Sequence, residues 1–233
     1  NDSFLPYTIN TIANVPELPA TSLNGNKDTL AMNYTFNNRA IPGLKLTARY
    51  QSYDYDNNTP SLIFPGYVST DQSVSTAPRQ SLPYAYNKKT AKFDVVWDRS
   101  KLYSLKVGYD WERLDRKHRD VERSVENSVG AAFDFTPVNW LTFRASYRRS
   151  EREPEHYEAN EESFPEGEGV GRGQLEELRK FDQAARTQDR AETLLIVDPT
   201  DRLSLSASFG TTQDDYHDSH YGMLKNVDSN ISF

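Results

Sequence analysis

The sequence predicts an all-β protein: an antiparallel up-and-down transmembrane β-barrel segment of about nine strands, with short periplasmic turns and long extracellular loops. Three observations lead to this prediction. Apolar and polar residues alternate over repeated stretches, each stretch has the length needed to cross a bilayer, and the connections between stretches are short and long in turn.

The clearest alternation lies in the hairpin between residues 90 and 111. Apolar residues occupy every second position, mostly charged residues stand between them, and a short turn separates the two halves. The apolar positions are Ala91, Phe93, Val95, Trp97, Tyr103, Leu105, Val107, Tyr109 and Trp111. Aromatic residues mark the ends of this face, as in the aromatic girdles of membrane barrels, whose strands cross the hydrocarbon with about ten tilted residues.

Composition supports a barrel and excludes several functions. Only 36% of the 233 residues are hydrophobic, mean hydropathy is -0.79, and 14 Tyr and 11 Phe outweigh 2 Met, so one apolar side per strand fits better than a full aliphatic core. A net charge of -7 offers no basic face for nucleic acid. Cysteine is absent, which excludes disulfides, thiolate chemistry and covalent haem attachment, so we expect no cofactor in this chain.

The same design recurs along the chain after a Pro- and Asn-rich segment at 1–27 that is typical of a loop. We predict short turns near 40, 100, 138 and 200, and long polar loops near 70, 118, 170 and 218. Nine is an odd number for a bacterial barrel, so we expect an internal portion of a larger one. The predicted strands lie near 29–37, 44–53, 89–98, 102–112, 124–135, 140–149, 190–197, 202–211 and 226–233.

Helical spacing occurs at one place. Leu175, Leu178, Phe181 and Ala185 recur at intervals of three and four, which predicts a short amphipathic helix within 174–187.

Candidate sites for chemistry are weak. His217 and His220 lie close to Asp214 and Asp215 and could ligate a metal, as could Asp54 with Asp56 and Asn57, but solvated loops explain both groups better. The carboxylates of 151–168 are typical of a solvated face, and His118 and His156 lie in loops rather than on strand faces. The sequence therefore predicts no enzyme, no metal site and no cofactor-binding site.

The polar strand positions are more informative. If the apolar faces meet lipid, the opposite faces line the lumen, and their side chains are bulky and mixed in sign. They favour a large polar object held inside the barrel, although a wet porin channel with charge selectivity is an open alternative. The candidates for contact with such a partner are Lys45, Arg49, Lys92, Asp94, Lys106, Glu112, Arg144 and Arg148.

An ordered set of segments resembles the MtrB/PioB family of decahaem-cytochrome-associated outer-membrane β-barrels. The segments are 50–60 (YQSYDYDNNTP), 83–86 (PYAY), 107–112 (VGYDWE), 147–150 (YRRS) and 178–186 (LRKFDQAAR). The resemblance covers nearly the whole chain, and family members are much longer. Some members carry an N-terminal Cys-x-x-Cys that has no counterpart here.

The resemblance implies a sheath that embeds and insulates a periplasmic multihaem c-type cytochrome, so that electrons cross the outer membrane for extracellular metal reduction or iron oxidation. The haems would reside on that partner, and an extracellular multihaem cytochrome could join it. The alternatives are a diffusion porin or transport barrel, and a soluble β-rich binding module.

Overall fold

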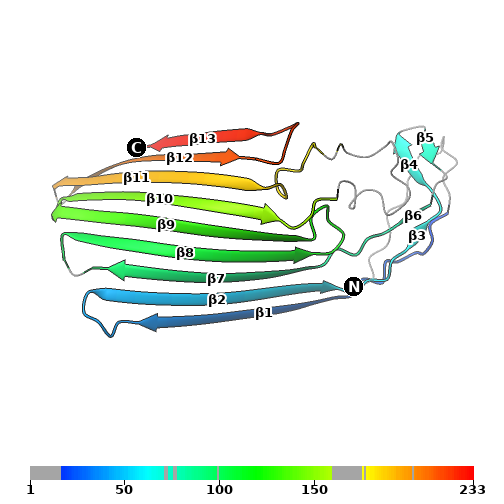
Figure 1. Cartoon of the computed structure of the whole chain (residues 1–233), viewed down its shortest axis with the longest axis horizontal. Coiled ribbons are helices and arrows are strands. Elements are labelled where there is room, and N and C mark those ends of the chain that lie inside the picture. The colour runs from blue at the N-terminus through cyan, green and yellow to red at the C-terminus, as the bar shows by residue number, and fades with distance from the viewer. Residues whose placement is uncertain are drawn as a thin grey trace.

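A computed structural model describes residues 17–70, 73–75, 78–98, 100–158, 175, 177–200 and 202–233. Its main feature is a single sheet of nine antiparallel strands, each hydrogen-bonded to the next long strand along the chain (Figure 1). The strands are β1 (Lys27–Asn38), β2 (Leu44–Asn57), β7 (Tyr86–Trp97), β8 (Tyr103–Arg116), β9 (Arg123–Val138), β10 (Leu141–Pro154), β11 (Arg186–Thr200), β12 (Leu203–Asp215) and β13 (Lys225–Ser232). The predicted fold class is confirmed as an up-and-down antiparallel sheet.

Short turns join the strands at one end of the sheet and long loops join them at the other, as Figure 1 shows. The first long loop holds two small sheets that the sequence did not indicate. They pair β3 (Ile63–Phe64) with β6 (Arg79–Gln80), and β4 (Tyr67–Thr70) with β5 (Ser73–Ser75). No helix in the described ranges is long and apolar enough to cross a membrane.

The strands extend further toward the long loops than their apolar alternation does. β2 continues to Asn57, β8 to Arg116 and β10 to Pro154, with the ladder to their neighbours maintained. Charged or polar residues occupy most positions on both faces in these extensions, so the two-residue alternation disappears although the backbone pairing continues.

The helix expected within 174–187 is wrong for the part that the structure describes. Isolated turns close where Leu175 accepts a hydrogen bond from the amide of Leu178 and where Lys180 accepts hydrogen bonds from the amides of Gln183 and Ala184. β11 begins at Arg186. Strand pairing takes over the end of the segment, because Thr187 pairs with Glu151 on β10. On the expected helical face, Leu175 and Phe181 remain about 60% exposed.

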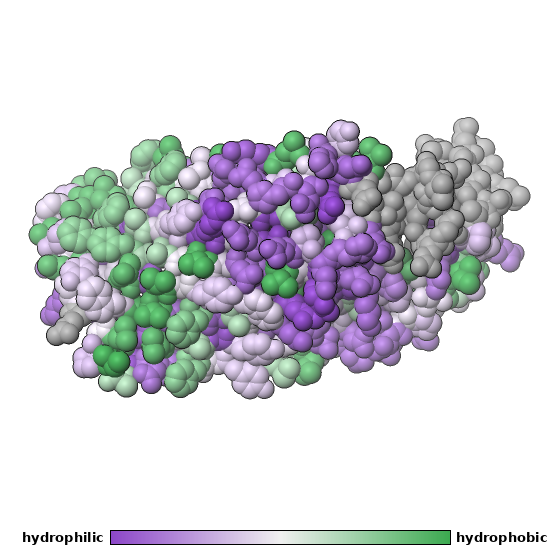
Figure 2. Space-filling model, in the orientation of Figure 1, coloured by the Kyte–Doolittle hydropathy of each residue, from purple (hydrophilic) through white to green (hydrophobic). Residues whose placement is uncertain are grey.

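Hydrophobic residues gather toward the short-turn ends of the strands and hydrophilic residues toward the long loops (Figure 2). We call the two sides of the sheet the apolar face, which carries Phe93, Leu105 and Phe133, and the polar face, which carries Lys92 and Lys106. The apolar face does not remain apolar along its whole length. Its last apolar residue is Trp111 on β8, Val125 on β9, Tyr147 on β10 and Phe209 on β12.

The last apolar residues of β8, β10 and β12 form a diagonal across the sheet, and Val125 of β9 lies beyond this diagonal, level with Arg113. The register places Trp111 level with Glu151 and Asp215, so the boundary recedes by six residues between β8 and β12. Six residues span about 20 Å along a strand, and four strand spacings span about 19 Å across the sheet. If this boundary lies parallel to a bilayer surface, the strands tilt by about 45° from the membrane normal, which is the tilt of transmembrane barrels.

Candidate functional site

The eight candidate partner-contact residues all lie on the polar face. The register aligns Arg49 with Lys92, and Arg144 and Arg148 occupy the same side of β10. Two-residue periodicity therefore placed them correctly relative to one another, while their role in binding a partner stays a prediction. The full set is Lys45, Arg49, Lys92, Asp94, Lys106, Glu112, Arg144 and Arg148.

Ion pairs cross this face from strand to strand. Lys106 Nζ lies 3.0 Å from Asp94 Oδ1, and Lys88 Nζ lies 2.8 Å from Glu112 Oε1. Arg144 binds Asp134, whose other carboxylate oxygen accepts a hydrogen bond from Ser104 Oγ at 3.3 Å. The polar face is thus a wall of mixed charges, several of which are joined by ion pairs between strands.

Glycines on β8 and β9 leave room for longer side chains in the middle of the polar face. Arg148 on β10 passes over Gly130 and binds Asp110 on β8, so the pair spans a whole strand. A Cβ on Gly130 would lie 3.6 Å from Arg148 Cβ and 3.7 Å from its Nε. Gly108 similarly leaves room for Asp94, because a Cβ there would lie only 2.6 Å from Asp94 Oδ1.

Short and long side chains stand next to one another on the polar face, and this has two consequences. Short residues become buried beneath long neighbours: Ser128 and Ser150 are 7% and 3% exposed, and their hydroxyl oxygens lie 2.8 Å apart. Between the charged walls, a hollow of about 270 Å³ remains above Gly108 and Gly130.

The sequence analysis missed the part of the polar face nearest the long loops. Arg186 Nη2 lies 3.2 Å from Glu126 Oε2, Arg186 Nη1 lies 3.6 Å from Asp214 Oδ1, and Gln188 donates to Asp214 at 2.8 Å. The signal was present in the alternation of Arg186, Gln188 and Arg190, but the helical spacing just before it obscured where β11 begins.

The His and Asp residues near the end of β12 do not converge. Successive strand residues face opposite sides, so Asp214 lies on the polar face, whereas Asp215 faces the other way and pairs with Lys225 at 3.8 Å. His217 instead contacts Thr187 Oγ1 at 2.6 Å. Over the described ranges, no three His, Asp or Glu side chains are grouped so that they could hold a metal ion.

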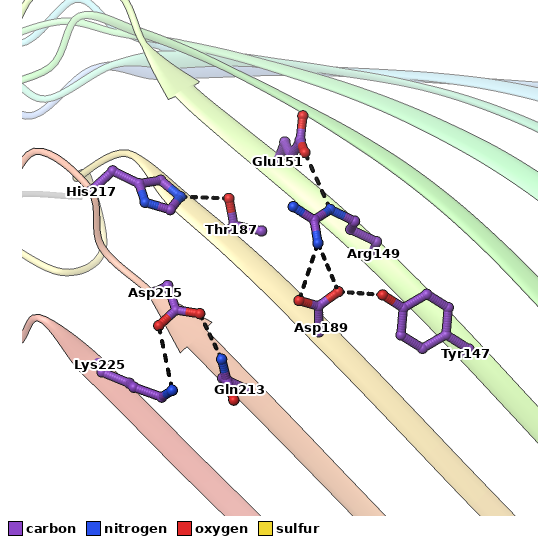
Figure 3. Close-up of polar contacts among 9 residues, drawn as sticks. All are labelled: Tyr147, Arg149, Glu151, Thr187, Asp189, Gln213, Asp215, His217 and Lys225. Carbon is purple, nitrogen blue, oxygen red and sulfur yellow. Dashed lines mark hydrogen bonds and ion pairs between the residues drawn. The ribbon is translucent and has the colours of Figure 1, made fainter.

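Beyond the diagonal boundary, the apolar face is charged. Arg149 lies 3.3 Å from Glu151 and 3.4 Å from Asp189, to which the Tyr147 hydroxyl is also hydrogen-bonded (Figure 3). On β8, partial burial would raise the pKa of Asp115, but hydrogen bonds from Arg113 and Arg123 outweigh it and hold that pKa below its usual range. These contacts are those of strand ends that stand in water above a membrane.

A tilted antiparallel sheet with an apolar band on one face and a charged wall on the other defines an outer-membrane β-barrel protein. Comparison with known proteins gives the particular family. A family model described as "Putative outer membrane beta-barrel porin, MtrB/PioB" matches residues 1–233. The chain belongs to the MtrB/PioB family.

A curated relative is similar over most of this chain. It is the "Outer membrane protein MtrB" of Shewanella baltica, 25% identical over 223 residues, which make up 93% of this chain and 30% of the relative. The chain thus spans about a third of the length of the relative it matches. Its location is the outer membrane, and its family is one of barrel, porin-like proteins of that membrane.

Proposed function

We propose that this chain is part of the wall of a barrel that encloses a periplasmic multihaem c-type cytochrome and insulates it from lipid. The observation that carries the proposal is the wall of paired charges on the polar face, which would line the lumen. Such a surface suits a large polar protein, because mixed charges orient and select a protein partner more than they increase its affinity.

The protein and its partner have different tasks in this proposal. The haems on the cytochrome supply the electron transfer. This chain contributes the lipid-facing band, which seats the barrel in the bilayer, and the polar wall, which holds the partner in register. We propose that the chain binds no cofactor of its own and catalyses no reaction.

Charge reversal on the polar face tests the proposal in the full-length barrel. Lys92→Glu, Lys106→Glu, Arg144→Glu and Arg148→Glu together should reduce the cytochrome that co-purifies in mild detergent by at least about tenfold, and weaken the complex more than the barrel itself. Arg149→Glu is the control for the Arg148→Glu change, because it reverses one charge one residue away but on the opposite face. Equal retention of cytochrome in both proteins would contradict the proposal.

Electron transfer provides a second readout that separates the sheath from the porin. Liposomes holding the barrel alone should show no Soret band and pass no electrons from an internal donor to an external acceptor. Assembly with the cytochrome should create that conductance. A purified barrel that admits small solutes freely and retains no cytochrome would favour the diffusion porin.

A further inference from the structure

The long loops pack into a small core of their own at one end of the sheet. Among the described residues, the buried apolar side chains are Ala85, Val121, Tyr157, Ala184 and Tyr216, and all lie at the long-loop end. Val121, Gln183 and Ala184 are completely buried, and Asp120 is 1% exposed. We call Asp120, Val121, Tyr157, Lys180, Gln183 and Ala184 the rim cluster.

The rim cluster ties together loops that are distant in sequence. The amide of Val121, in the β8–β9 loop, donates to Gln183 Oε1 in the β10–β11 loop at 2.9 Å. The amide of Glu158 donates to the carbonyl of Asp120 at 2.7 Å. The β12–β13 loop joins them through His220, whose amide donates to the carbonyl of Glu177 at 3.1 Å.

An ion pair lies at the centre of the cluster. Lys180 Nζ approaches Asp120 Oδ2 to 2.7 Å, and the Asp120 side chain is fully shielded from solvent. The Tyr157 hydroxyl lies 3.5 Å from the same carboxylate oxygen and accepts a hydrogen bond from the Lys180 amide at 3.0 Å. Removing the lysine would leave a carboxylate buried without its cation, which is strongly unfavourable.

The backbone of these loops is also held in conformations that it would rarely adopt freely. His118 has a φ of 59° and His156 a φ of 69°. Non-glycine residues stay in this region only where surrounding contacts enforce it. The described parts of the β8–β9 and β10–β11 loops are therefore held in defined conformations by their contacts.

The cluster is anchored on the polar side of the sheet. Arg152, which shares the polar face of β10 with Arg148, donates to the carbonyls of Ala184 and Phe181 at 2.9 and 2.6 Å. Arg116, at the end of β8, donates to the carbonyl of Val121 at 3.3 Å. Burial lowers the pKa of Arg116 and Arg152, in keeping with loops that cover both side chains. The loops thus lie on the side that the proposed function assigns to the lumen.

We propose that the rim cluster is a preassembled lid that narrows the lumen at the long-loop end, with the Asp120–Lys180 ion pair as its latch. The lid restricts the passage of solutes through this mouth of the barrel whether or not the lumen holds a protein. It goes beyond the sheath function, since a barrel with another content would have the same lid.

Single-channel conductance of the full-length barrel, reconstituted in planar bilayers without cytochrome, tests the lid. Lys180→Glu places two carboxylates together in the cluster and should raise conductance at least about threefold, while Lys180→Arg should keep it near the wild-type value. Lys117→Glu is the matched control: it makes the same charge change in the β8–β9 loop, at a side chain that is 69% exposed and pairs with Asp56 at 3.7 Å.

Hydrogen exchange at the amides of Val121 and Glu158 reports the latch independently of conductance. In Lys180→Glu both amides should lose protection, and in Lys117→Glu they should keep it. Unchanged protection in Lys180→Glu would overturn the latch, and lost protection without a rise in conductance would overturn the lid. If Lys180→Glu does not fold, Lys180→Gln provides the same comparison with a smaller perturbation.

Discussion

Arg148 on β10 and Asp110 on β8 form an ion pair across the intervening strand β9, and Gly130 is the residue over which the guanidinium passes. Asp110 also lies 3.7 Å from Lys92 on β7, so this carboxylate joins charges from three strands. The geometry depends on β9 having no side chain at the crossing point.

Gly130→Leu should therefore separate Arg148 from Asp110. We expect the free energy of unfolding of the full-length barrel to fall by about 1–3 kcal/mol, because the new side chain occupies the path of the guanidinium. Gly130→Ala should change it by less than about 0.5 kcal/mol, since its Cβ would meet the Tyr147 carbonyl oxygen at 3.4 Å and no closer atom. Denaturant titration in lipid measures both, and equal midpoints for Leu and Ala would contradict the crossing.

Charges should be tolerated very differently on the two faces. Val107→Arg places a cation on the apolar face in the middle of the band and should cost about 2–4 kcal/mol near the bilayer midplane. Thr142→Arg places the same side chain on the polar face and should cost less than about 1 kcal/mol. Refolding into lipid vesicles compares them, and equal costs would reverse the assignment of the faces.

The diagonal boundary predicts that residues in one hydrogen-bonded row lie at different depths. Tyr109 on β8 is level with Val129 on β9 and Arg149 on β10. With a tilt of about 45°, two strand spacings displace Arg149 by about 7 Å toward the long-loop side of the membrane. Nitroxide labels at Tyr109→Cys and Arg149→Cys should show this in their accessibility to oxygen and to a polar nickel complex. Equal depths would exclude the tilt.

The Arg113–Asp115–Arg123 contact predicts a local pH dependence at the membrane surface. Because the folded pKa of Asp115 is lowered, its stabilising contribution is complete above the usual carboxyl pKa of about 4 and is lost as pH falls through the folded value. Arg123→Gln should raise the pKa of Asp115 toward its usual value, while Arg190→Gln, on the polar face, should not. Carboxyl-carbon NMR titration of Asp115 measures the shift, and no change in Arg123→Gln would contradict the assigned cause.

The membrane-crossing parts of the strands could be predicted from the sequence alone, because one apolar and one polar face produce a two-residue period in each of them. Where charged residues occur on both faces, as in Arg113–Arg116 of β8, apolar and polar residues no longer alternate and the predicted strand ends early. The helix within 174–187 was predicted wrongly from the spacing of Leu175, Leu178 and Phe181. Spacing over a few residues carries no information on the pairing of Thr187 with Glu151.

The polar face shows the same limit. Periodicity placed Arg148 and Asp110 on one side of the sheet, but their contact needs the register of three strands and the glycine between them. The contacts of the rim cluster could not be predicted from the sequence pattern. Val121 and Gln183 are 62 residues apart, and they meet through loops that have no periodic pattern.

The small number of buried apolar side chains has a consequence for how this protein is held together. In the described ranges these side chains lie in the loops or at their junctions with the strands, so the band of Leu, Val, Phe and Trp residues on the apolar face makes its hydrophobic contacts with acyl chains. The acyl chains then take the place that a hydrophobic core has in a soluble protein. Stability becomes a property of the lipid as much as of the polypeptide, and it should rise and fall as acyl chain length matches or misses the height of the band.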